Sequence, residues 1–299
     1  MQVGIDPHSG FCRGVIRAIG TAEEFLDTAG TGRLFSLGAI VHNEEELARL
    51  AGRGLVVLDK QDLQEMRDPA PGETLLIRAH GEPPQVYARI RELGFDVIDC
   101  TCPVVLGLQK KIREAYSRQE AAGGQVVLFG KIGHPEVLGL VGQADEGGVV
   151  VVETPEQLQE RIADGSIRTD RDIELFSQTT MTPEGYVRVR ETLAAAMQAG
   201  ASLAVHDTIC GQVASRYREL ADFARSHDVI VFVSGRESSN GRVLCELCQR
   251  ANIRTWHIGS AAQLRREWFR PEDRVGVCGA TSTPKWLLEE VADAIRNLQ

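Results

Sequence analysis

The sequence predicts an α/β protein made of three similar lobes, and two repeated patterns lead to this prediction. A short apolar stretch ends near a single cysteine, and a helical pattern follows, at Cys12, Cys102 and Cys210. After each helical pattern comes a strand that ends in glycine and a polar loop. A further helix and strand then lead to a second polar loop that proline closes. Because strands and helices alternate throughout, we expect parallel sheets joined by right-handed crossovers.

The leading strand of each repeat is a short apolar segment that finishes at aspartate. These strands are expected at residues 3–6, 96–99 and 203–207. The helix after Cys12 shows apolar residues at helical spacing, among them Val15, Ile19 and Ala22. Later strands are continuous apolar runs, which are typical of strands buried on both faces of a parallel sheet. These runs are residues 126–129, 149–152 and 229–233.

The lobe boundaries follow from the repeats. Prolines stand where helices are expected to start, at Pro83-Pro84, Pro183 and Pro284, and this is the position that tolerates proline best. We place the lobes at 1–95, 96–202 and 203–299. Since no linker rich in Pro, Gly or Ser separates them, we expect three lobes of one compact body.

Composition excludes several classes of protein. With 299 residues, 25% charged and 43% hydrophobic, the chain is typical of a globular protein with a sizeable core. The net charge of -9 argues against a nucleic-acid partner, and the apolar runs are too short to span a membrane. No signal peptide is visible, and seven irregularly spaced cysteines do not resemble a disulfide framework. We therefore expect a cytoplasmic location.

The three repeated cysteines are candidate metal ligands. A lone cysteine is more often a small buried apolar residue, but three in equivalent positions favour a shared role. At a strand-to-helix junction, free backbone N–H groups and the helix dipole favour a thiolate. Thiolates select zinc, copper(I) or iron–sulfur clusters. The gaps of 90 residues or more match no zinc-finger or ferredoxin spacing. Three thiolates without a fourth indicate a cluster with one open coordination position.

The other four cysteines are expected to have structural roles. Cys100 lies two residues before Cys102 and is an alternative ligand, although the other two repeats have no equivalent. Cys245 and Cys248 form a C-x-x-C pattern on an amphipathic helical stretch, where packing in the core is favoured over redox chemistry. Cys278 ends a buried strand and is expected in the core.

Polar residues in the loops after the strands form a second candidate set. Imidazoles, hydroxyls and amides at several helix N-termini suit an anionic ligand, particularly phosphate. No Walker or G-x-G-x-x-G sequence appears, so a nucleotide is not expected. The residues of this set are His42, His80, His134, Thr179, Ser238, Ser239, Asn240 and Ser282.

Glu136 is the one carboxylate that we expect within this polar set, and the other two repeats have no counterpart of it. It could simply be a favourable charge at a helix N-terminus. In a desolvated pocket beside an anion, however, its acid form would be favoured and could deliver protons. Glu82 and Glu184 adjoin prolines at helix starts that we expect to be exposed.

Eight motifs occur in the order found in one enzyme family. The chain resembles the 4-hydroxy-3-methylbut-2-enyl diphosphate reductases, which catalyse the last step of the methylerythritol phosphate route to isoprenoids. The resemblance covers nearly the whole chain. Its motifs are Gly10–Val15, Ile40–Asn43, Arg78–Gly81, Thr101–Pro103, Gly133–Val137, Gln178–Thr180, Asp207–Cys210 and Ser238–Asn240.

The resemblance implies a trefoil of three α/β lobes around one four-iron, four-sulfur cluster bound by Cys12, Cys102 and Cys210. It implies that Thr179 meets the substrate hydroxyl, that Glu136 supplies protons, and that His134 completes the catalytic set. The residues expected to bind the diphosphate are His42, His80, His134, Ser238, Ser239, Asn240 and Ser282.

The implied reaction is the reductive removal of the substrate hydroxyl, which gives isopentenyl and dimethylallyl diphosphate. Electrons are expected from a donor such as ferredoxin or flavodoxin, and the lobe with Ser238–Asn240 is expected to close over the substrate. An iron–sulfur lyase of the quinolinate-synthase type, a non-enzymatic iron–sulfur redox sensor and a zinc hydrolase are the alternatives. The lyase would need no external electrons, and the sensor would bind no diphosphate.

Overall fold

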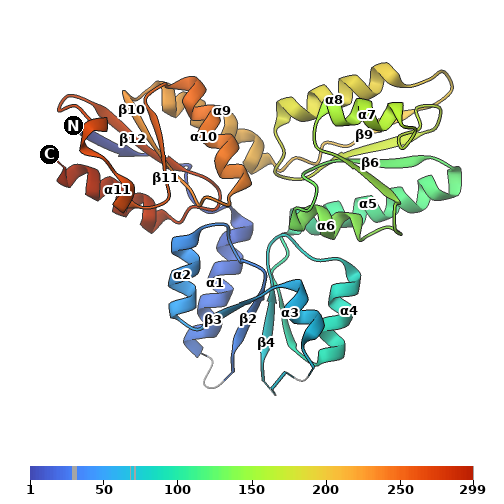
Figure 1. Ribbon diagram of the computed structural model, residues 1–299, viewed down its shortest axis with the longest axis horizontal. Helices are drawn as coiled ribbons and strands as arrows, with labels where there is room; N and C mark the ends of the chain where they lie inside the picture. The colour runs from blue at the N-terminus through green and yellow to red at the C-terminus, as the bar shows by residue number, and fades with distance from the viewer. Residues whose placement is uncertain (29–31, 68, 71, 299) are drawn as a thin grey trace. The chain divides into compact units, whose positions relative to one another are not determined.

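The computed structural model describes residues 1–28, 32–67, 69–70 and 72–298, and Figure 1 traces the chain through its helices and strands. The described chain divides into two compact units. Unit 1 comprises Met1–Asp62, Ala70–Arg78 and Gln212–Gln299, and unit 2 comprises Leu63–Pro69 and Ala79–Gly211. The described strands form three sheets of four strands each, and every pairing with a described register is parallel. The prediction of three α/β lobes is confirmed.

The first sheet belongs to unit 1 and has the strand order β1-β12-β10-β11. The N-terminal strand β1 lies beside the C-terminal helix α11, as Figure 1 shows. The strands are β1 (Gln2–Ile5), β10 (Val229–Val233), β11 (Thr255–Ile258) and β12 (Arg274–Gly279). The helices are α9 (Gly211–Arg225), α10 (Ser239–Ala251) and α11 (Lys285–Asn297), with two 3₁₀ turns at Ala261–Gln263 and Arg266–Trp268.

Helices cover both faces of this sheet because alternate residues of β10 point in opposite directions. Val229, Val231 and Val233 pack with the apolar face of α11. Ile230 and Phe232 pack with α9 and α10 on the other side. All five residues of β10 are buried, as expected for a central strand of a doubly covered parallel sheet.

The second sheet has the order β3-β2-β4-β5. Its two central strands are fully buried, whereas the edge strands carry exposed residues. The strands are β2 (Leu34–Leu37), β3 (Leu55–Leu58), β4 (Thr74–Ile77) and β5 (Asp96–Asp99). The helices are α1 (Arg13–Thr28), α2 (Glu44–Gly52), α3 (Lys60–Glu65) and α4 (Pro84–Leu93).

The third sheet belongs to unit 2 and has the order β7-β6-β8-β9. On β6, Val127 and Phe129 pack with α7 and α8, and Val126 and Leu128 pack with α5 and α6. The strands are β6 (Gln125–Phe129), β7 (Val149–Val152), β8 (Ile173–Ser177) and β9 (Leu203–Val205). The helices are α5 (Pro103–Ala122), α6 (Pro135–Val141), α7 (Pro155–Ala163) and α8 (Pro183–Ala196).

The leading strand of each repeat pairs outside its own stretch of chain. The N-terminal strand β1 pairs with β12 near the C-terminus. In the same way, β5 joins the sheet of β2 to β4, and β9 pairs with β8. Each sheet therefore contains three strands from one predicted lobe and one strand from the next repeat along the cycle. The lobe boundaries themselves stay a prediction.

Most predicted strands and helix starts are found within two residues of their expected places. The strands at 96–99, 149–152 and 229–233 have the predicted bounds. β7 differs in one respect, because it is an edge strand whose two middle residues are only partly buried. Proline stands at the first helical position of α4 and α8, whereas Pro284 is the N-cap of α11.

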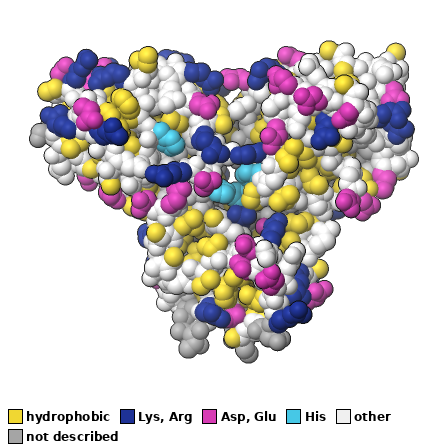
Figure 2. Space-filling model, in the orientation of Figure 1, with side chains coloured by type: hydrophobic (Ala, Val, Ile, Leu, Met, Phe, Trp, Pro, Cys, Tyr) yellow, Lys and Arg dark blue, Asp and Glu magenta, His cyan; other side chains and the backbone are white. Residues whose placement is uncertain are grey.

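The surface carries charges of both signs. On the face drawn in Figure 2, basic and acidic side chains are interspersed among apolar and neutral ones. Across the part of the chain that the structure describes, each helix is too short or too polar to cross a lipid bilayer.

Candidate active site

Each sheet places two polar loops beside each other at the carboxyl ends of its central strands. These strands are β10 and β12, β2 and β4, and β6 and β8. In the first and third sheets, the helices that follow the two central strands pack on opposite faces. Such a switch point between adjacent parallel strands is where open α/β sheets bind ligands. The loops with the predicted site residues follow these strands.

Glu136 and Thr179 meet at the switch point of the third sheet. Glu136 lies in the first turn of α6 after β6, and Thr179 lies in the loop after β8. The Thr179 backbone N–H donates to Glu136 Oε1 at 2.8 Å, and the Thr179 hydroxyl donates to Oε2 at 2.9 Å. The Glu136 side chain is 1% exposed. Two loops of unit 2 therefore hold one buried carboxyl group in a fixed orientation.

Burial raises the pKa of Glu136 from 4.5 to about 7, because the charged form loses its hydration. The hydrogen bonds from Thr179, and one from Gln178, act in the opposite direction and favour the charged form. Desolvation is the larger effect. Glu136 can therefore carry a proton near neutral pH, as a general acid requires.

Replacement of Glu136 by glutamine is expected to change the pH dependence of stability. The proton binds more tightly to the folded chain than to the unfolded chain. The resulting stabilisation is complete below about pH 4.5 and is lost as the pH rises through about 7. Between pH 5 and 8 the free energy of unfolding of the wild type should fall by about 2–3 kcal/mol relative to that of Glu136→Gln. Urea unfolding of both proteins across this range measures the difference, and parallel stability curves would contradict it.

His134 has a defined tautomer. It is the N-cap of α6, and its Nδ1 accepts the backbone N–H of Glu136 at 3.2 Å. The Gln178 amide nitrogen also approaches Nδ1 at 3.2 Å, while the Gln178 oxygen accepts the Lys131 N–H. Because Nδ1 is an acceptor here, the neutral ring carries its proton on Nε2. His134 can therefore donate an Nε2–H hydrogen bond to a ligand.

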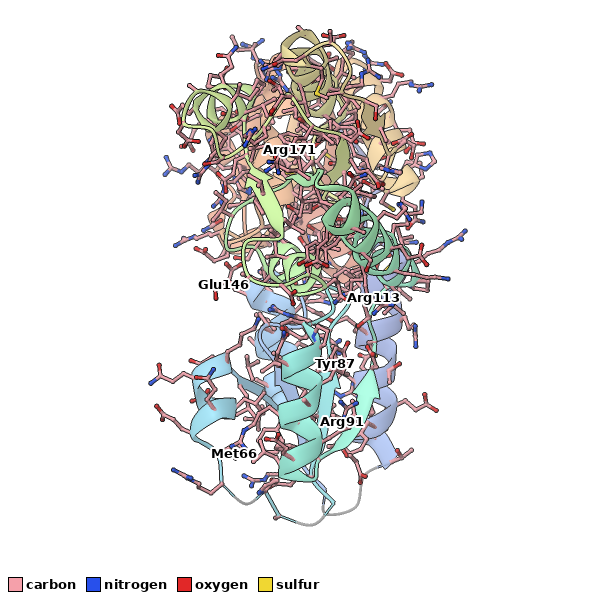
Figure 3. The ribbon with its side chains drawn as sticks, turned by 90° about the vertical axis from the view of Figure 1, so that its right-hand side faces the viewer. Met66, Tyr87, Arg91, Arg113, Glu146 and Arg171 are labelled. Carbon is pink, nitrogen blue, oxygen red and sulfur yellow. The ribbon has the colours of Figure 1, made fainter. Side chains whose placement is uncertain are left out.

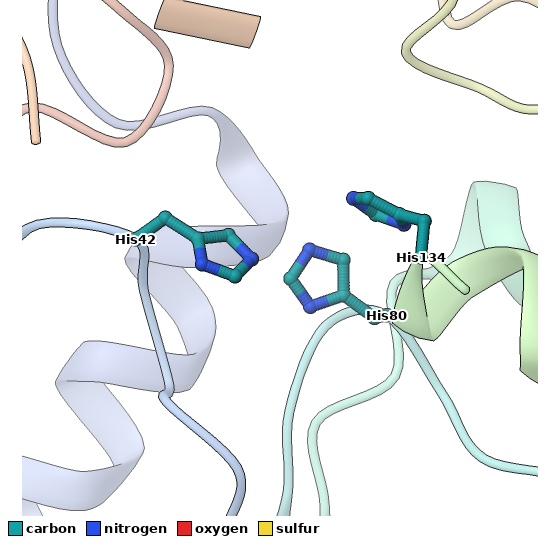
Figure 4. Close-up of side chains that lie close together, drawn as sticks. All are labelled: His42, His80 and His134. Carbon is teal, nitrogen blue, oxygen red and sulfur yellow. The ribbon is translucent and has the colours of Figure 1, made fainter. Parts of the chain in front are cut away.

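His80 lies next to His134 within unit 2. It occupies the loop between β4 and α4, and the two ring centroids are 5.3 Å apart at an interplanar angle of 80°. Figure 4 shows these two rings, with His134 at the start of a helix and His80 on a loop. Unit 2 thus brings two predicted histidines together, and the N–H groups of imidazole rings can donate hydrogen bonds to an anion.

The serine residues predicted to bind phosphate meet at the switch point of the first sheet. Ser238 is the N-cap of α10 and accepts the Gly241 N–H at 3.0 Å. Its hydroxyl lies 3.0 Å from the hydroxyl of Ser282, which follows β12. The Asn240 side chain donates to Thr281 Oγ1 at 2.9 Å. Ser239 opens α10, so this loop pair combines hydroxyls with the N–H groups of a helix start.

His42 also lies in unit 1, close to the loop after β10. It precedes Asn43, the N-cap of α2, whose side chain accepts the Glu46 N–H. A Cβ atom on Gly235 would lie 2.5 Å from the His42 carbonyl oxygen, so only glycine allows this approach. The Arg236 N–H donates to Glu44 at 3.0 Å. Unit 1 therefore brings the His42 loop against the loop that leads to Ser238.

The three predicted cysteine ligands share one local geometry. Each directly precedes a helix, and each donates its backbone N–H to a carbonyl in the loop after a central strand. The pairs are Cys12 with Thr281 at 3.2 Å, Cys102 with Ala79 at 3.0 Å, and Cys210 with Thr179 at 2.9 Å. Thr179 therefore contacts both Glu136 and Cys210. The predicted strand-to-helix placement is confirmed.

Exposure separates these three cysteines from the other four. Cys12, Cys102 and Cys210 are partly exposed and not in disulfides. The others have at most 4% exposure, and Cys245, Cys248 and Cys278 lie in the apolar cluster between the first sheet and its helices. Their predicted core positions are confirmed. Cys100 is 1% exposed and, unlike the three predicted ligands, does not directly precede a helix.

Two features of the site differ from the sequence-based expectation. Glu82 is 1% exposed, which contradicts its predicted place at an exposed helix start. It precedes the N-cap Pro83 and packs inside unit 2, whereas Glu184 is exposed as expected. Gln178 was not predicted as a site residue. Its position directly before Thr179, in a polar loop after a strand, was the available signal, but only the structure shows that its amide nitrogen lies against Nδ1 of His134.

A family model described as LytB protein matches residues 3–296. The chain belongs to the LytB family. Its LytB relatives include proteins named 4-hydroxy-3-methylbut-2-enyl diphosphate reductase. The one from Parabacteroides distasonis is 45% identical, with 100% of this chain and 98% of the relative covered. The one from Porphyromonas gingivalis is 43% identical, with 100% of this chain and 99% of the relative covered.

Solved structures agree with the LytB assignment. One described as (E)-4-hydroxy-3-methyl-but-2-enyl diphosphate reductase, the terminal enzyme of the non-mevalonate pathway, matches with a TM-score of 0.69 and 34% identity. The match covers 99% of this chain and 100% of that one. The E-1-hydroxy-2-methyl-but-2-enyl-4-diphosphate reductase from Plasmodium falciparum matches with a TM-score of 0.81 and 22% identity. This match covers 98% of this chain and 86% of that one. The second match shows that the fold is shared.

Proposed function

We propose that this LytB chain reduces 4-hydroxy-3-methylbut-2-enyl diphosphate to isopentenyl and dimethylallyl diphosphate. The observation that carries the proposal is the contact of Glu136, a buried carboxyl with a pKa of about 7, with Thr179, whose carbonyl accepts the N–H of Cys210. A proton donor is thereby joined to a candidate metal ligand. The full-length similarity to proteins named as this reductase supports the same reaction.

We also propose that Cys12, Cys102 and Cys210 bind one four-iron, four-sulfur cluster. The donor set fits, because these three thiols are partly exposed at helix starts while the remaining cysteines are buried. A cluster with only three thiolate ligands leaves one iron open to a substrate oxygen. When bound, such a cluster supplies single electrons and a Lewis-acidic iron. The lobes 1–95, 96–202 and 203–299 would each provide one cysteine.

The proposed roles of the polar residues follow from their hydrogen bonds. Protonated Glu136 would deliver a proton to the substrate hydroxyl, either directly or through the Thr179 hydroxyl. The C–O bond breaks and the hydroxyl leaves as water. Two electrons and a second proton then complete the hydrocarbon product. His134 would donate its Nε2–H to the bound anion.

The diphosphate would be bound by the hydroxyl, amide and imidazole groups of the paired loops. Anchoring this remote part of the substrate orients the reacting carbon, so binding energy contributes to the chemical step. The proposed residues are His42, His80, His134, Ser238, Ser239, Asn240 and Ser282. The electron donor would be a small redox protein of the ferredoxin or flavodoxin kind.

An anaerobic assay tests this function. The protein is incubated with the hydroxylated allylic diphosphate and a dithionite-reduced viologen dye. We expect oxidation of the dye, with two electrons used for each molecule of product, and formation of both diphosphates. The absence of consumption would overturn the proposal. Consumption that proceeds equally without reductant would instead indicate a lyase.

A further inference from the structure

The three aspartates at the ends of the leading strands differ sharply in their surroundings. Asp99 ends β5, and Asp207 follows β9 by two residues, and both are exposed. Asp6, which follows β1, is 2% exposed. The connection from the aspartate to the cysteine is also longer here, with residues 7–11 before Cys12 and only two residues in the other repeats. The burial of Asp6 is therefore a feature specific to the loop that leads to Cys12.

Asp6 is buried together with Arg216 and Ser9. Arg216 Nη2 lies 2.5 Å from Asp6 Oδ2 and donates to Ser9 Oγ at 2.6 Å. Ser9 Oγ donates to Asp6 Oδ2 at 2.8 Å and accepts the N–H of Gly279, the last residue of β12, at 2.8 Å. Arg216 and Ser9 are 3% and 4% exposed. A charged network therefore connects α9, the Cys12 loop and β12 within unit 1.

Arg216 occupies a position that is apolar in the other two repeats. It lies six residues after Cys210, on the buried face of α9. The residues six after Cys12 and Cys102 are Ala18 and Leu108, both buried apolar residues. At this position an apolar residue is sufficient to pack the helix. The arginine therefore has a role that two homologous helices do not need.

One face of the N-terminal part of α9 contacts the Cys12 loop. Gln212 accepts the backbone N–H of Arg13 at 3.4 Å, next to Cys12. Arg216 is one turn further along the helix, and Glu219, in the middle of the helix, is 3.8 Å from His8. The spacing of 212, 216 and 219 places these residues on one helical face. The exposed outer contacts are weak, so the buried ion pair is the fixed point of this interface.

Stability alone is a poor explanation for the ion pair. Apolar residues of similar volume often replace a buried ion pair without loss of stability, because desolvation offsets the attraction between the charges. Arg216 Nη1 is also buried and finds no hydrogen-bond acceptor among the described residues, which is unfavourable. What a buried pair provides is directional: it fixes one geometry between two segments of chain.

We infer that Arg216 is a positioning residue for the metal centre: through Asp6 and Ser9 it fixes the loop that presents Cys12, and it does so from the helix that directly follows Cys210. This inference rests on the proposed function, because it assumes that Cys12 is a ligand. The loop carries Gly10, with a φ of 128°, between Ser9 and Cys12, so without the anchor the cysteine would sample other orientations.

Iron retention tests the inference directly. The variants Arg216→Met, Arg216→Lys and Asp6→Asn are reconstituted anaerobically with iron and sulfide in the full-length chain. Iron release to a chelator is then followed by visible absorption, and the unfolding of each apo-protein by circular dichroism. We expect Arg216→Met to release iron about tenfold faster than wild type or more. Arg216→Lys should give an intermediate rate, because it keeps the charge but not the planar guanidinium that places Nη2 against both Asp6 and Ser9.

The matched control is the ion pair of Arg254 and Asp273, which lies in the same unit. Arg254 contacts both Asp273 oxygens at 2.8 and 2.7 Å, at the opposite end of β12 from Gly279. Arg254→Met should lower the unfolding temperature and leave the rate of iron release within about twofold of wild type. Equal acceleration by Arg254→Met and Arg216→Met would overturn the inference, because it would mean that general destabilisation controls iron release.

A double variant separates positioning from folding. Asp6→Leu with Arg216→Met replaces the pair by apolar residues and leaves no single charge buried. We expect this variant to regain apo-protein stability relative to Arg216→Met and still to release iron about tenfold faster than wild type. Retention of iron at the wild-type rate would contradict the inference while leaving the proposed function intact. Failure of the wild type to bind iron would instead contradict the proposed function.

Discussion

Replacement of Glu136 by glutamine is expected to reduce turnover by about 10²–10⁴-fold, the usual contribution of a general acid. Glutamine keeps the size of the side chain. Its amide oxygen can accept the Thr179 N–H and its NH₂ group can donate to the Thr179 hydroxyl oxygen, so the loops of the third sheet should remain in place. The variant lacks the titratable proton that the buried carboxyl holds with a pKa of about 7. Binding should persist while the step that releases water fails.

The measurement is steady-state kinetics under anaerobic conditions with a dye reductant, with the iron content determined on the same sample. In the wild type, kcat should fall as the pH rises above about 7, because the proton donor becomes ionised. Glu184→Gln is the matched control, since Glu184 is an exposed glutamate in the first turn of α8, two helices further along the chain. Glu184→Gln should retain activity within about twofold.

Normal turnover in Glu136→Gln would remove Glu136 from the proposed proton path. A loss of iron in this variant would mean instead that Glu136 supports the metal centre. Such a role would have a structural basis, because Glu136 contacts Thr179, whose carbonyl accepts the Cys210 N–H. A loss of activity with unchanged iron content is the outcome that the proposed acid role predicts.

Replacement of Cys102 by serine is expected to reduce bound iron to about a tenth of the wild-type content or less, because a serine hydroxyl does not replace a thiolate ligand. Cys102 is the N-cap of α5 and is partly exposed, so the variant should fold normally. Anaerobic reconstitution, followed by iron and sulfide analysis and visible absorption, measures the effect.

Cys100→Ser is the control because Cys100 lies only two residues away and is 1% exposed. It should keep its iron, although the buried hydroxyl should cost about 1–3 kcal/mol of stability. Full iron content in Cys102→Ser together with loss in Cys100→Ser would transfer the ligand role to Cys100. Cys248→Ser adds a second comparison, since Cys248 lies in the core between α10 and the first sheet.

Local patterns in the sequence predicted much of the fold. Continuous apolar runs predicted the central strands β6 and β10, because strands buried on both faces need apolar residues at every position. Prolines predicted the starts of α4 and α8, since proline suits the first helical turn. Cysteines at strand-to-helix junctions predicted three positions with equivalent backbone hydrogen bonds.

Long-range pairing could not be predicted in the same way. Nothing in residues 3–6 indicates that this strand pairs with β12 at the other end of the chain, because side-chain patterns encode burial and not the partner strand. The buried pair of Asp6 and Arg216 could not be predicted for the same reason, since its two residues lie 210 positions apart in the sequence. The prediction that Glu82 is exposed was wrong for a related reason. A charged residue is expected at the surface unless its tertiary packing is known, and Glu82 is buried.

The most direct test of the central claim, three thiolates around one cluster with an open iron, is Mössbauer spectroscopy of anaerobically prepared, iron-57-labelled protein. We predict that about a quarter of the iron signal differs from the rest, and that this fraction changes when the hydroxylated allylic diphosphate is added. A spectrum in which all iron is equivalent and the diphosphate has no effect would contradict the claim.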